Sequence, residues 1–497
     1  MQFGHLTPGA CYQAMKAHDA RFDGRFFVGV ATTRIYCRPI CRVRLPRQEN
    51  CSFYPSAAAA EAAGFRPCLR CRPELAPGFA ATEASAKLAR AAARLIEDGV
   101  VTDIDLTQVA QRIGVTDRHL RRIFAEEFGV SPVQFAQTHR LLLAKRLLTD
   151  TSLAVSEVAF ASGFSSVRRM NALFAQRYGF SPTRLRREGS QHDVMIDADA
   201  LTFILPYRPP YDFSRLLAFF AMRAIPGVES VSGGAYRRIV RVEAKAGAAS
   251  RGWLEVTQLP QRHALQLRIA STLAHASQEL LSRSRQVFDV GADPQEIAAA
   301  LGTRAAGAEG LRLPGAFDAF ELALRAVLGQ QVSVKAARTL ATRFVEAFGE
   351  PVATPFGDLT RMFPAPSRVA QLEPDAIGGL GIVGQRAAAM IAIAQAVDAG
   401  ILVLDAAGDP AQAIDALCRI RGIGPWTAHY IAMRALAWPD AWPPQDVALL
   451  SALQLPNTAR GQRAADALAQ AWRPWRSYAV LHAWRQSEHT DTTKEQR

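Results

Sequence analysis

The sequence lacks the features that would place the protein in a membrane or outside the cell. It contains no uninterrupted apolar stretch long enough to span a bilayer, and residues 1–8 lack the basic region and apolar core of a secretory signal. We therefore expect a cytoplasmic protein. Acidic residues are fewer than basic ones, 45 against 58, and the formal net charge is +13. This balance points to nucleic acid as a partner, with an anionic membrane surface as the alternative.

Cysteine is scarce in most of the chain, because six of the seven cysteines lie within the first 71 residues. Four of them form two short pairs, Cys37-x-x-x-Cys41 and Cys68-x-x-Cys71. In a reducing compartment such clustering favours a metal over disulfides, and this spacing predicts a Cys₄ zinc site. Because closed Cys₄ sites are usually structural, a purely structural zinc module is the alternative.

Acidic residues are also missing around the first cysteine pair, where arginine is abundant. No acid precedes Glu49 in a stretch that contains Arg34, Arg38, Arg42, Arg44 and Arg47. Uncompensated arginines near a metal predict contacts with phosphate, and a solvated basic face is the alternative. The predicted DNA contacts of this segment are Arg34, Arg42, Arg44 and Arg47.

The stretches T-T-R-I-Y-C-R-P-I-C-R at residues 32–42 and G-F-R-P-C-L-R-C at residues 64–71 resemble the N-terminal zinc domain of the Ada family. The resemblance covers about residues 1–78. It implies that Cys37 is both a ligand of Zn²⁺ and the acceptor of a methyl group, taken irreversibly from a methylphosphotriester in DNA. Four thiolates around Zn²⁺ carry a charge of about −2, and methylation of Cys37 removes one negative charge. DNA affinity should then rise, so that repair becomes an electrostatic switch.

The next segment is strongly helical and contains an internal repeat. Residues 105–112 predict an amphipathic helix that ends at Gly114, and residues 116–128 predict a basic second helix. The same arrangement returns over residues 155–178, with Gly163 at the turn. The repeat indicates two DNA-binding helix-turn-helix units, and a generic helical bundle with basic faces is the alternative. The predicted DNA contacts are Arg118, Arg121, Arg122, Arg168 and Arg169.

The spacing of this repeat resembles the AraC-type transcription-factor domain over about residues 84–187. The resemblance implies two recognition helices in successive major grooves. Beyond it, residues 201–205, 238–242 and 265–269 predict strands, and residues 213–223 a helix. We expect a small α+β subdomain over about residues 200–282, which resembles the N-terminal sheet domain of AlkA-type glycosylases.

A glycine turn between two apolar helical runs organises the region from residue 284 to 487. Residues 420–428 read I-R-G-I-G-P-W-T-A. The glycines permit close backbone approach, and the amides that begin the second helix favour an anion such as a duplex phosphate. Downstream, Asp446 follows two prolines and begins another apolar helical run. An ordinary helix–helix turn and an ordinary helix cap are the alternatives, because caps are common.

The glycine turn, the segment of two prolines and Asp446, and the W-R-P-W-R-S-Y stretch at residues 472–478 resemble the helix–hairpin–helix DNA glycosylases, most closely those of AlkA type. The resemblance implies that Asp446 stabilises a sugar cation and orients or deprotonates water during excision of alkylated purines such as 3-methyladenine. Trp426, Tyr430 and Trp484 would stack on the flipped cationic base. From spacing alone, packing of Trp426 and Tyr430 in a core would be the preferred interpretation. The expected DNA contacts in the turn are Gly422, Gly424 and Thr427.

Two positions depart from the AlkA-type glycosylases that the chain resembles. Gln331 stands where a leucine wedge would fill the gap left by the flipped base, and we expect Gln331 to contact DNA. Val447 replaces a tyrosine wall, which puts the substrate range in question. Bifunctional relatives carry a lysine where Trp426 stands and use it to form a Schiff base. Its absence predicts a monofunctional glycosylase that leaves the DNA backbone uncut.

The sequence as a whole predicts a multidomain fold. It comprises a small α+β Cys₄ zinc domain, an all-α double helix-turn-helix domain, and an α+β subdomain with an all-α helix–hairpin–helix domain. We expect an alkylation-damage protein that transfers methyl groups to Cys37, activates transcription and excises bases through Asp446. The alternatives are a transcription factor with a non-catalytic damage-binding domain, and a glycosylase merely targeted by its front half. The expected cofactor is Zn²⁺. The expected partners are double-stranded DNA, both alkylated DNA and promoter DNA, and RNA polymerase. We expect a monomer that is associated with the nucleoid.

Overall fold

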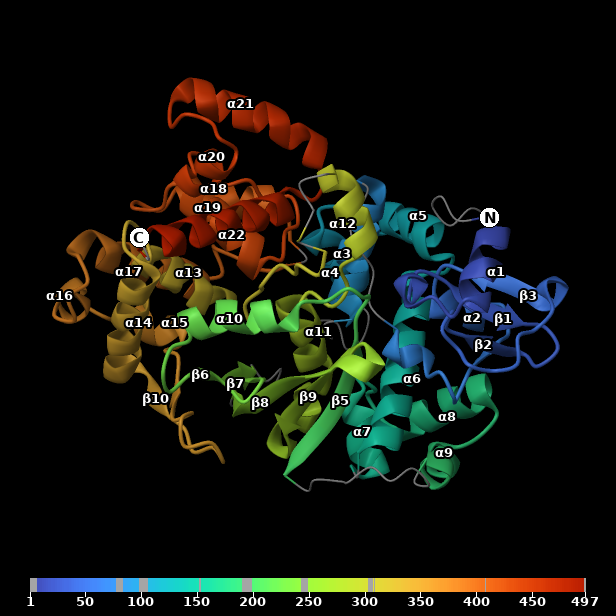
Figure 1. Cartoon of the computed structure of the whole chain (residues 1–497). Coiled ribbons are helices and arrows are strands. Elements are labelled where there is room, and N and C mark those ends of the chain that lie inside the picture. The colour runs from blue at the N-terminus through green and yellow to red at the C-terminus, as the bar shows by residue number, and fades with distance from the viewer. Residues whose placement is uncertain are drawn as a thin grey trace. The chain divides into compact units, whose positions relative to one another are not determined.

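The computed structural model describes residues 7–76, 84–97, 106–151, 153–189, 199–242, 249–302, 307, 309–406 and 408–495. The chain forms two compact units (Figure 1). The first contains Met1–Pro209, Val242–Arg285 and Val290–Ala292, and the second contains Pro210–Arg241, Gln286–Asp289 and Asp293–Arg497. None of the helices in the described ranges is both long and apolar enough to cross a membrane.

The first unit begins with a four-stranded sheet in the order β3-β1-β2-β4. The central strand β1 pairs antiparallel with β2 and β3, whereas β4 runs parallel to β2. Val28 of β1 lies opposite Cys37, so that β2 ends at the first cysteine pair. The elements of this module are α1 (Pro8–Lys16), β1 (Phe27–Val30), β2 (Ile35–Cys37), β3 (Cys51–Tyr54), α2 (Ala57–Ala62) and β4 (Arg66–Pro67).

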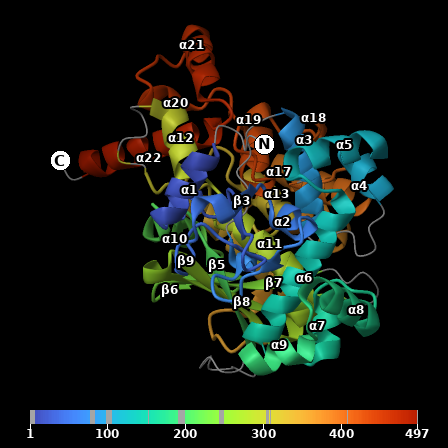
Figure 2. The same cartoon turned by 90° about the vertical axis from the view of Figure 1, so that its right-hand side faces the viewer.

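Seven helices follow, and they confirm the predicted repeat. The hydroxyls of Thr116 and Ser166 cap the second helix of each repeat, and each of these helices ends at a left-handed glycine, Gly129 or Gly179. The helix that joins the repeats, α6, contacts α7, α8 and α9 (Figures 1 and 2). The helices are α3 (Ala84–Glu97), α4 (Leu106–Arg112), α5 (Asp117–Phe128), α6 (Pro132–Asp150), α7 (Val155–Ala161), α8 (Val167–Tyr178) and α9 (Pro182–Gly189).

The predicted strands are present, with two further strands that the sequence did not indicate. In the first unit, β5 (Ala200–Pro206), β9 (Ala264–Ala270) and β8 (Ser250–Leu259) are adjacent antiparallel strands. In the second unit, β6 (Glu229–Ser232) forms a hairpin with β7 (Ala235–Val242). Strand β6 escaped prediction because its sequence, E-S-V-S, has a single apolar residue and no alternation to mark a buried face.

The second unit is otherwise mostly helical, as predicted. One large apolar core joins α13, α14, α17 and the helices of the glycine turn, with Phe344, Met390 and Ile431 fully buried. Helix α11 (Ser277–Val287) lies mostly in the first unit. The described helices of the second unit are α10 (Phe213–Arg223), α12 (Pro294–Leu301), α13 (Ala319–Leu328), α14 (Val334–Phe348), α15 (Pro366–Val369), α16 (Pro374–Gly378), α17 (Gly384–Asp398), α18 (Pro410–Cys418), α19 (Pro425–Ala435), α20 (Val447–Ala452), α21 (Ala459–Ala469) and α22 (Arg476–Glu495). Two short strands, β10 (Glu350–Pro351) and β11 (Arg361–Met362), form a separate pair.

A buried carboxylate joins the small sheet of the first unit to its helices. Glu61 of α2 is only 5% exposed and accepts hydrogen bonds from the hydroxyls of Tyr36 at 3.1 Å, Thr138 at 3.0 Å and Tyr178 at 3.4 Å. Burial raises the pKa of Glu61 to about 7, against an ordinary value of 4.5. The folded state therefore favours the protonated carboxyl.

Replacing Glu61 with glutamine is expected to change the pH dependence of stability. Because the folded pKa is raised, the stability contributed by the protonated carboxyl is present below pH 4.5 and is lost as pH rises through 7. The wild-type free energy of unfolding should thus fall by about 3 kcal/mol across this window relative to Glu61→Gln. Urea unfolding of both zinc-loaded proteins at pH 5 and pH 8 measures this difference, with zinc release as the signal for unfolding. Equal pH dependence in the two proteins would contradict the assignment.

Candidate functional sites

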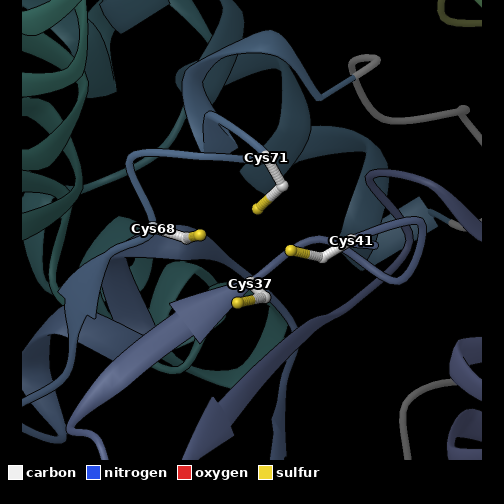
Figure 3. A group of neighbouring side chains, drawn as sticks. All are labelled: Cys37, Cys41, Cys68 and Cys71. Atoms are coloured by element: carbon white, nitrogen blue, oxygen red, sulfur yellow. The ribbon is translucent and has the colours of Figure 1, made fainter. Parts of the chain in front are cut away.

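The four cysteines of the two predicted pairs converge in the first unit. Cys37 ends β2, Cys41 lies in the following turn, and Cys68 and Cys71 lie in the loop after β4. Their sulfur atoms all lie within 4.8 Å of one another and face a common space (Figure 3). Three of the four side chains are buried, and Cys71 is half-buried. This arrangement confirms the predicted cluster.

The chemistry of the cluster fits Zn²⁺. The neighbouring thiols of Cys41, Cys68 and Cys71 raise the pKa of the Cys37 thiol, and burial raises it further. Four crowded thiols therefore cannot ionise together unless a cation compensates their charge. Thiolates are preferred ligands of Zn²⁺, and a set of four such ligands completes its tetrahedral coordination. Cys37, Cys41, Cys68 and Cys71 are accordingly the residues that would hold the ion.

Arg38 differs from the other arginines of this segment, because it is only 5% exposed. Its Nε donates to Oδ1 of Asp23 at 2.8 Å, and a second bond joins its Nη2 to Oδ2 of the same carboxylate. Its backbone N–H donates to the Cys71 sulfur at 3.4 Å, and its Nη1 donates to the Cys71 carbonyl at 3.1 Å. Arg38 supports the cysteine loop from inside, so the expectation that it contacts phosphate is wrong.

The other four arginines are on the surface, as a DNA contact requires. Arg34, Arg42, Arg44 and Arg47 are all exposed, and Arg47 forms a loose ion pair with Glu49 at 3.6 Å. An exposed pair of this kind contributes little, so Arg47 can exchange Glu49 for a phosphate at small cost. These four residues stay predicted DNA contacts.

The two basic helices present their predicted arginines to solvent. On α5, Arg118, Arg121 and Arg122 are exposed; Arg121 pairs with Asp117 at 3.2 Å and Arg122 with Glu126 at 2.8 Å. On α8, whose sequence contains no acidic residue, Arg168 and Arg169 are exposed. Both helices therefore satisfy the first requirement of a recognition helix, an accessible basic face.

The glycine turn lies between α18 and α19. Gly422 has a φ of 95°, which L side chains rarely adopt, and Gly424 is the exposed N-cap of α19. Gln330 fixes the turn, since its Nε2 donates to the Gly422 carbonyl at 2.9 Å and to the Thr427 hydroxyl at 3.1 Å. Thr427 is itself buried. Gly422 and Gly424 thus remain candidates for a phosphate contact, whereas Thr427 supports the turn from within.

Asp446 is the N-cap of α20 and is only 5% exposed. Its Oδ1 accepts the backbone N–H of Leu449 at 2.8 Å. Its Oδ2 accepts two indole N–H groups, from Trp426 at 2.8 Å and from Trp484 at 3.0 Å. Three donors therefore fix the position of the carboxylate.

The three predicted aromatic residues lie together beside this carboxylate. The rings of Trp426 and Tyr430 stack with centroids 5.4 Å apart, and the Trp484 ring lies 6.1 Å from Tyr430 and 6.4 Å from Trp426. All three line a cavity of about 280 Å³, together with Gly329 and Val332 of the loop after α13. The structure thus brings the predicted acid and the predicted aromatic walls into one site.

Arg434 belongs to this site, although the sequence analysis missed it. It lines the same cavity, donates from Nη1 to the Tyr430 hydroxyl at 2.8 Å, and donates to the carbonyls of Pro314 and Gly315. Burial raises the pKa of Tyr430, but the guanidiniums of Arg434, Arg223 and Arg325 together outweigh it and lower that pKa below its ordinary value. The sequence did contain a signal for this contact, because a residue four positions after Tyr430 lies on the same face of a helix.

Gln331 occupies an exposed position next to the aromatic cavity. Its backbone is left-handed, with a φ of 53°, which is uncommon for a residue with a Cβ atom. Neighbouring residues anchor the loop, since Gln330 bonds the glycine turn and Arg386 donates to the Gln330 carbonyl. A strained, exposed amide at the rim of a cavity is compatible with the predicted DNA contact.

The replacement at position 447 has a visible structural result. Val447 is 59% exposed and forms no wall. Next to it, Ala448 and Trp484 line a second cavity of about 560 Å³, with Met222 and Leu481 on its apolar side. Val447 therefore adds no wall to the aromatic cavity, at the position where the glycosylases that the chain resembles have a tyrosine.

Comparisons with known proteins agree with this division of the chain. Four family models match: "Metal binding domain of Ada" over residues 10–74, "Helix-turn-helix domain" over 109–188, "AlkA N-terminal domain" over 202–318 and "HhH-GPD superfamily base excision DNA repair protein" over 324–477. A thiol cluster, paired helix-turn-helix units and a helix–hairpin–helix site define a protein of DNA-alkylation repair and its regulation.

Three relatives identify the family. The chain is 39% identical over 489 residues to the "Probable bifunctional transcriptional activator/DNA repair enzyme AlkA" of Mycobacterium tuberculosis, with 96% of each chain covered. It is 37% identical to "DNA-3-methyladenine glycosylase 2" of Escherichia coli, over 57% of this chain and 96% of that protein. It is 39% identical to "Bifunctional transcriptional activator/DNA repair enzyme Ada" of Escherichia coli, over 29% of this chain and 38% of that protein. The chain belongs to the family of bifunctional transcriptional activator/DNA repair proteins that join Ada and AlkA modules.

Proposed function

We propose that the protein repairs alkylated DNA by two chemistries and couples one of them to transcription. Cys37 takes methyl groups from methylphosphotriesters, and Asp446 directs the hydrolytic excision of alkylated purines such as 3-methyladenine. The observation that carries this proposal is the presence of two complete sites in one chain: four converging thiols, and a carboxylate bonded to the two indoles of an aromatic cavity. We assign these activities to modules at residues 1–78, 84–187, 200–282 and 284–487.

The methyl transfer is a displacement at carbon. The Cys37 sulfur attacks the methyl carbon, a carbon–sulfur bond forms as the carbon–oxygen bond breaks, and the phosphate leaves as an ordinary phosphodiester anion. Zn²⁺, when bound by the four cysteines, keeps their sulfurs deprotonated at neutral pH. Because the thioether product does not revert, each chain reacts once.

The product differs from the starting protein in charge, and this difference supports the regulatory role. Methylation removes one negative charge from a cluster that lies among the exposed arginines Arg34, Arg42, Arg44 and Arg47. Attraction between these arginines and DNA phosphates is then less opposed, so affinity for promoter DNA rises. The exposed arginines of α5 and α8 supply the contacts in the grooves, and RNA polymerase is the partner of the activated protein.

The excision begins when the damaged base leaves the stack and enters the aromatic cavity. A cationic alkylated purine is attracted to the electron-rich rings of Trp426, Tyr430 and Trp484. As the glycosidic bond breaks, the Asp446 carboxylate faces the positive charge that develops on the sugar and orients or deprotonates the attacking water. The missing wall at Val447 supports a range of base shapes.

Incubation of the zinc-loaded protein with methylated duplex DNA is expected to give three results in one tube. Free 3-methyladenine should appear, Cys37 should gain one methyl group by peptide mass spectrometry, and the DNA backbone should remain intact until heat or base is applied. The third result follows because none of the described residues that line the aromatic cavity is a lysine, and no amine is placed to form a Schiff base. Strand breaks without heat or base would contradict the monofunctional assignment.

The oligomeric state and the site of action are parts of the same proposal. Two reading helices in one chain give a monomer the means to contact two successive major grooves, so we propose a monomer. We place it at the nucleoid, because both of its proposed substrates and its promoter are DNA.

A further inference from the structure

The loop that presents Asp446 has few backbone hydrogen-bond donors near its end. Pro443 and Pro444 carry no N–H, so Gln445 has the only backbone donor between Trp442 and Asp446. That donor is satisfied by a side chain from another helix, since the Gln445 N–H donates to Oε1 of Gln462 on α21 at 2.9 Å. The position of Asp446 is thus coupled to α21.

The backbone of Gln445 makes this coupling more important. Gln445 has a φ of 58°, in the left-handed region that residues with a Cβ atom rarely occupy. A strained conformation of this kind persists only where surrounding contacts maintain it. The Gln462 side chain is such a contact, and it acts on the residue that immediately precedes the proposed catalytic carboxylate.

Gln462 is itself held in place by Asp466, one helical turn further along α21. Gln462 Nε2 donates to Asp466 Oδ1 at 2.8 Å, and the Trp442 indole N–H donates to the same oxygen at 2.9 Å. Asp466 therefore fixes the loop at Trp442 directly and at Gln445 through Gln462. The two anchors lie on either side of the two prolines, where the backbone has no donor of its own.

The first turn of α21 is fitted closely to the loop that precedes it. A Cβ atom at Gly461, in its first turn, would lie 1.9 Å from the Pro456 carbonyl oxygen, so only glycine fits this contact. Helices α20 and α21 are neighbours in both views (Figures 1 and 2). Gln462 directly follows Gly461, so it lies in this closely fitted first turn.

We propose that Gln462 and Asp466 are positioning residues for excision. They keep Gln445 in the left-handed conformation from which Asp446 begins α20 and meets the indoles of Trp426 and Trp484. This proposal rests on the proposed function of Asp446. It adds a pair of residues that touch neither the base nor the reacting sugar and that act through the backbone of the loop.

Single-turnover excision of 3-methyladenine by the full zinc-loaded chain tests the proposal. Gln462→Leu removes the acceptor at nearly constant size and should lower the rate about 10- to 100-fold, because small displacements of a catalytic group are costly. Affinity for a duplex with a cleavage-resistant 2′-fluorinated sugar should stay within about 2-fold. Gln470→Leu on the adjoining turn is the matched control and should keep the wild-type rate, because its amide donates to the Asp466 carbonyl and accepts from Arg473, both at 3.1 Å, and bonds neither Gln445 nor the Asp466 carboxylate.

A swap of the two polar groups separates positioning from a loss of folding. Gln462→Glu keeps an acceptor for the Gln445 N–H but places two carboxylates together, so its rate should fall. Adding Asp466→Asn gives the introduced carboxylate a donor again and leaves an amide oxygen for Trp442, so the rate should return to within about 3-fold of wild type.

Three results would overturn the proposal. Gln462→Leu could excise at the wild-type rate, it could change duplex affinity without changing the excision rate, or Gln462→Glu combined with Asp466→Asn could fail to restore the rate. Asp446→Asn is measured alongside: if it excises at the wild-type rate, the role of Asp446 fails first, whereas a silent Gln462→Leu beside an inactive Asp446→Asn refutes only the positioning role.

Discussion

Asp446→Asn is expected to lower the rate of base release about 1000-fold while duplex binding persists. The substitution removes the negative charge that faces the developing sugar cation. It also disturbs the geometry, because one carboxylate oxygen accepts the Leu449 N–H and the other accepts both indoles. An asparagine has one acceptor oxygen, so its amino group must face either the helix cap or the two indole donors.

Single-turnover release of 3-methyladenine measures this effect, and binding to a cleavage-resistant duplex shows whether the site remains formed. Asp446→Glu is the matched control for charge. It keeps a carboxylate but moves it by about one bond length, so we expect an intermediate loss. Release of base by Asp446→Asn at the wild-type rate would contradict the role of Asp446. If the wild-type release also came from a contaminating glycosylase, a damage-binding transcription factor would be the better description of the chain.

Cys37→Ala is expected to abolish methyl uptake from methylphosphotriesters. The loss should be complete, because the acceptor sulfur is consumed one for one and no other group replaces it in a single transfer. Cys51→Ala is the matched control: Cys51 lies on β3 of the same sheet, outside the four-thiol cluster, and its replacement should leave uptake at one methyl group per chain. Peptide mass spectrometry after incubation with methylated DNA gives the number of methyl groups per chain for both variants.

The zinc content of each variant completes this experiment. Three cysteines remain in Cys37→Ala, so the metal measurement distinguishes loss of the acceptor from loss of the whole site. A methyl group on Cys41, Cys68 or Cys71 in the wild-type protein would assign the reaction to a different sulfur. Unmodified Cys37 beside free 3-methyladenine would reduce the first module to a zinc-stabilised targeting domain.

Features defined by local spacing were predictable from the sequence. The two cysteine pairs lie close in the chain, and the repeat of helices is marked by Gly129 and Gly179 in equivalent places, where each helix ends in the left-handed conformation. Helix α10 follows its predicted bounds because its apolar residues have a regular period and its N-cap is an aspartate. Asp446 and the aromatic residues needed more than spacing, since a helix cap and a buried aromatic pair are common in ordinary cores.

Features defined by contacts between distant segments were not predictable. Arg38 had the sequence context of a DNA-contacting arginine, but it is buried and bonded to Asp23, which lies in the segment before β1. Gln462 follows the prolines by 18 residues, counted from Pro444, and no periodicity connects it with Gln445. Thr427 was expected at the surface of the turn, and the Gln330 amide instead engages its hydroxyl inside.

The double role of the two tryptophans limits how this site can evolve. Trp426 and Trp484 are walls of the aromatic cavity and also donors to Asp446, so a phenylalanine at either position would withdraw a donor even where it preserved the stack. New base preferences therefore have to arise at positions that do not bond the acid, such as Val447, Ala448 and Met222. The site thus combines a side whose residues are tied to Asp446 by hydrogen bonds with a side that is free of this constraint.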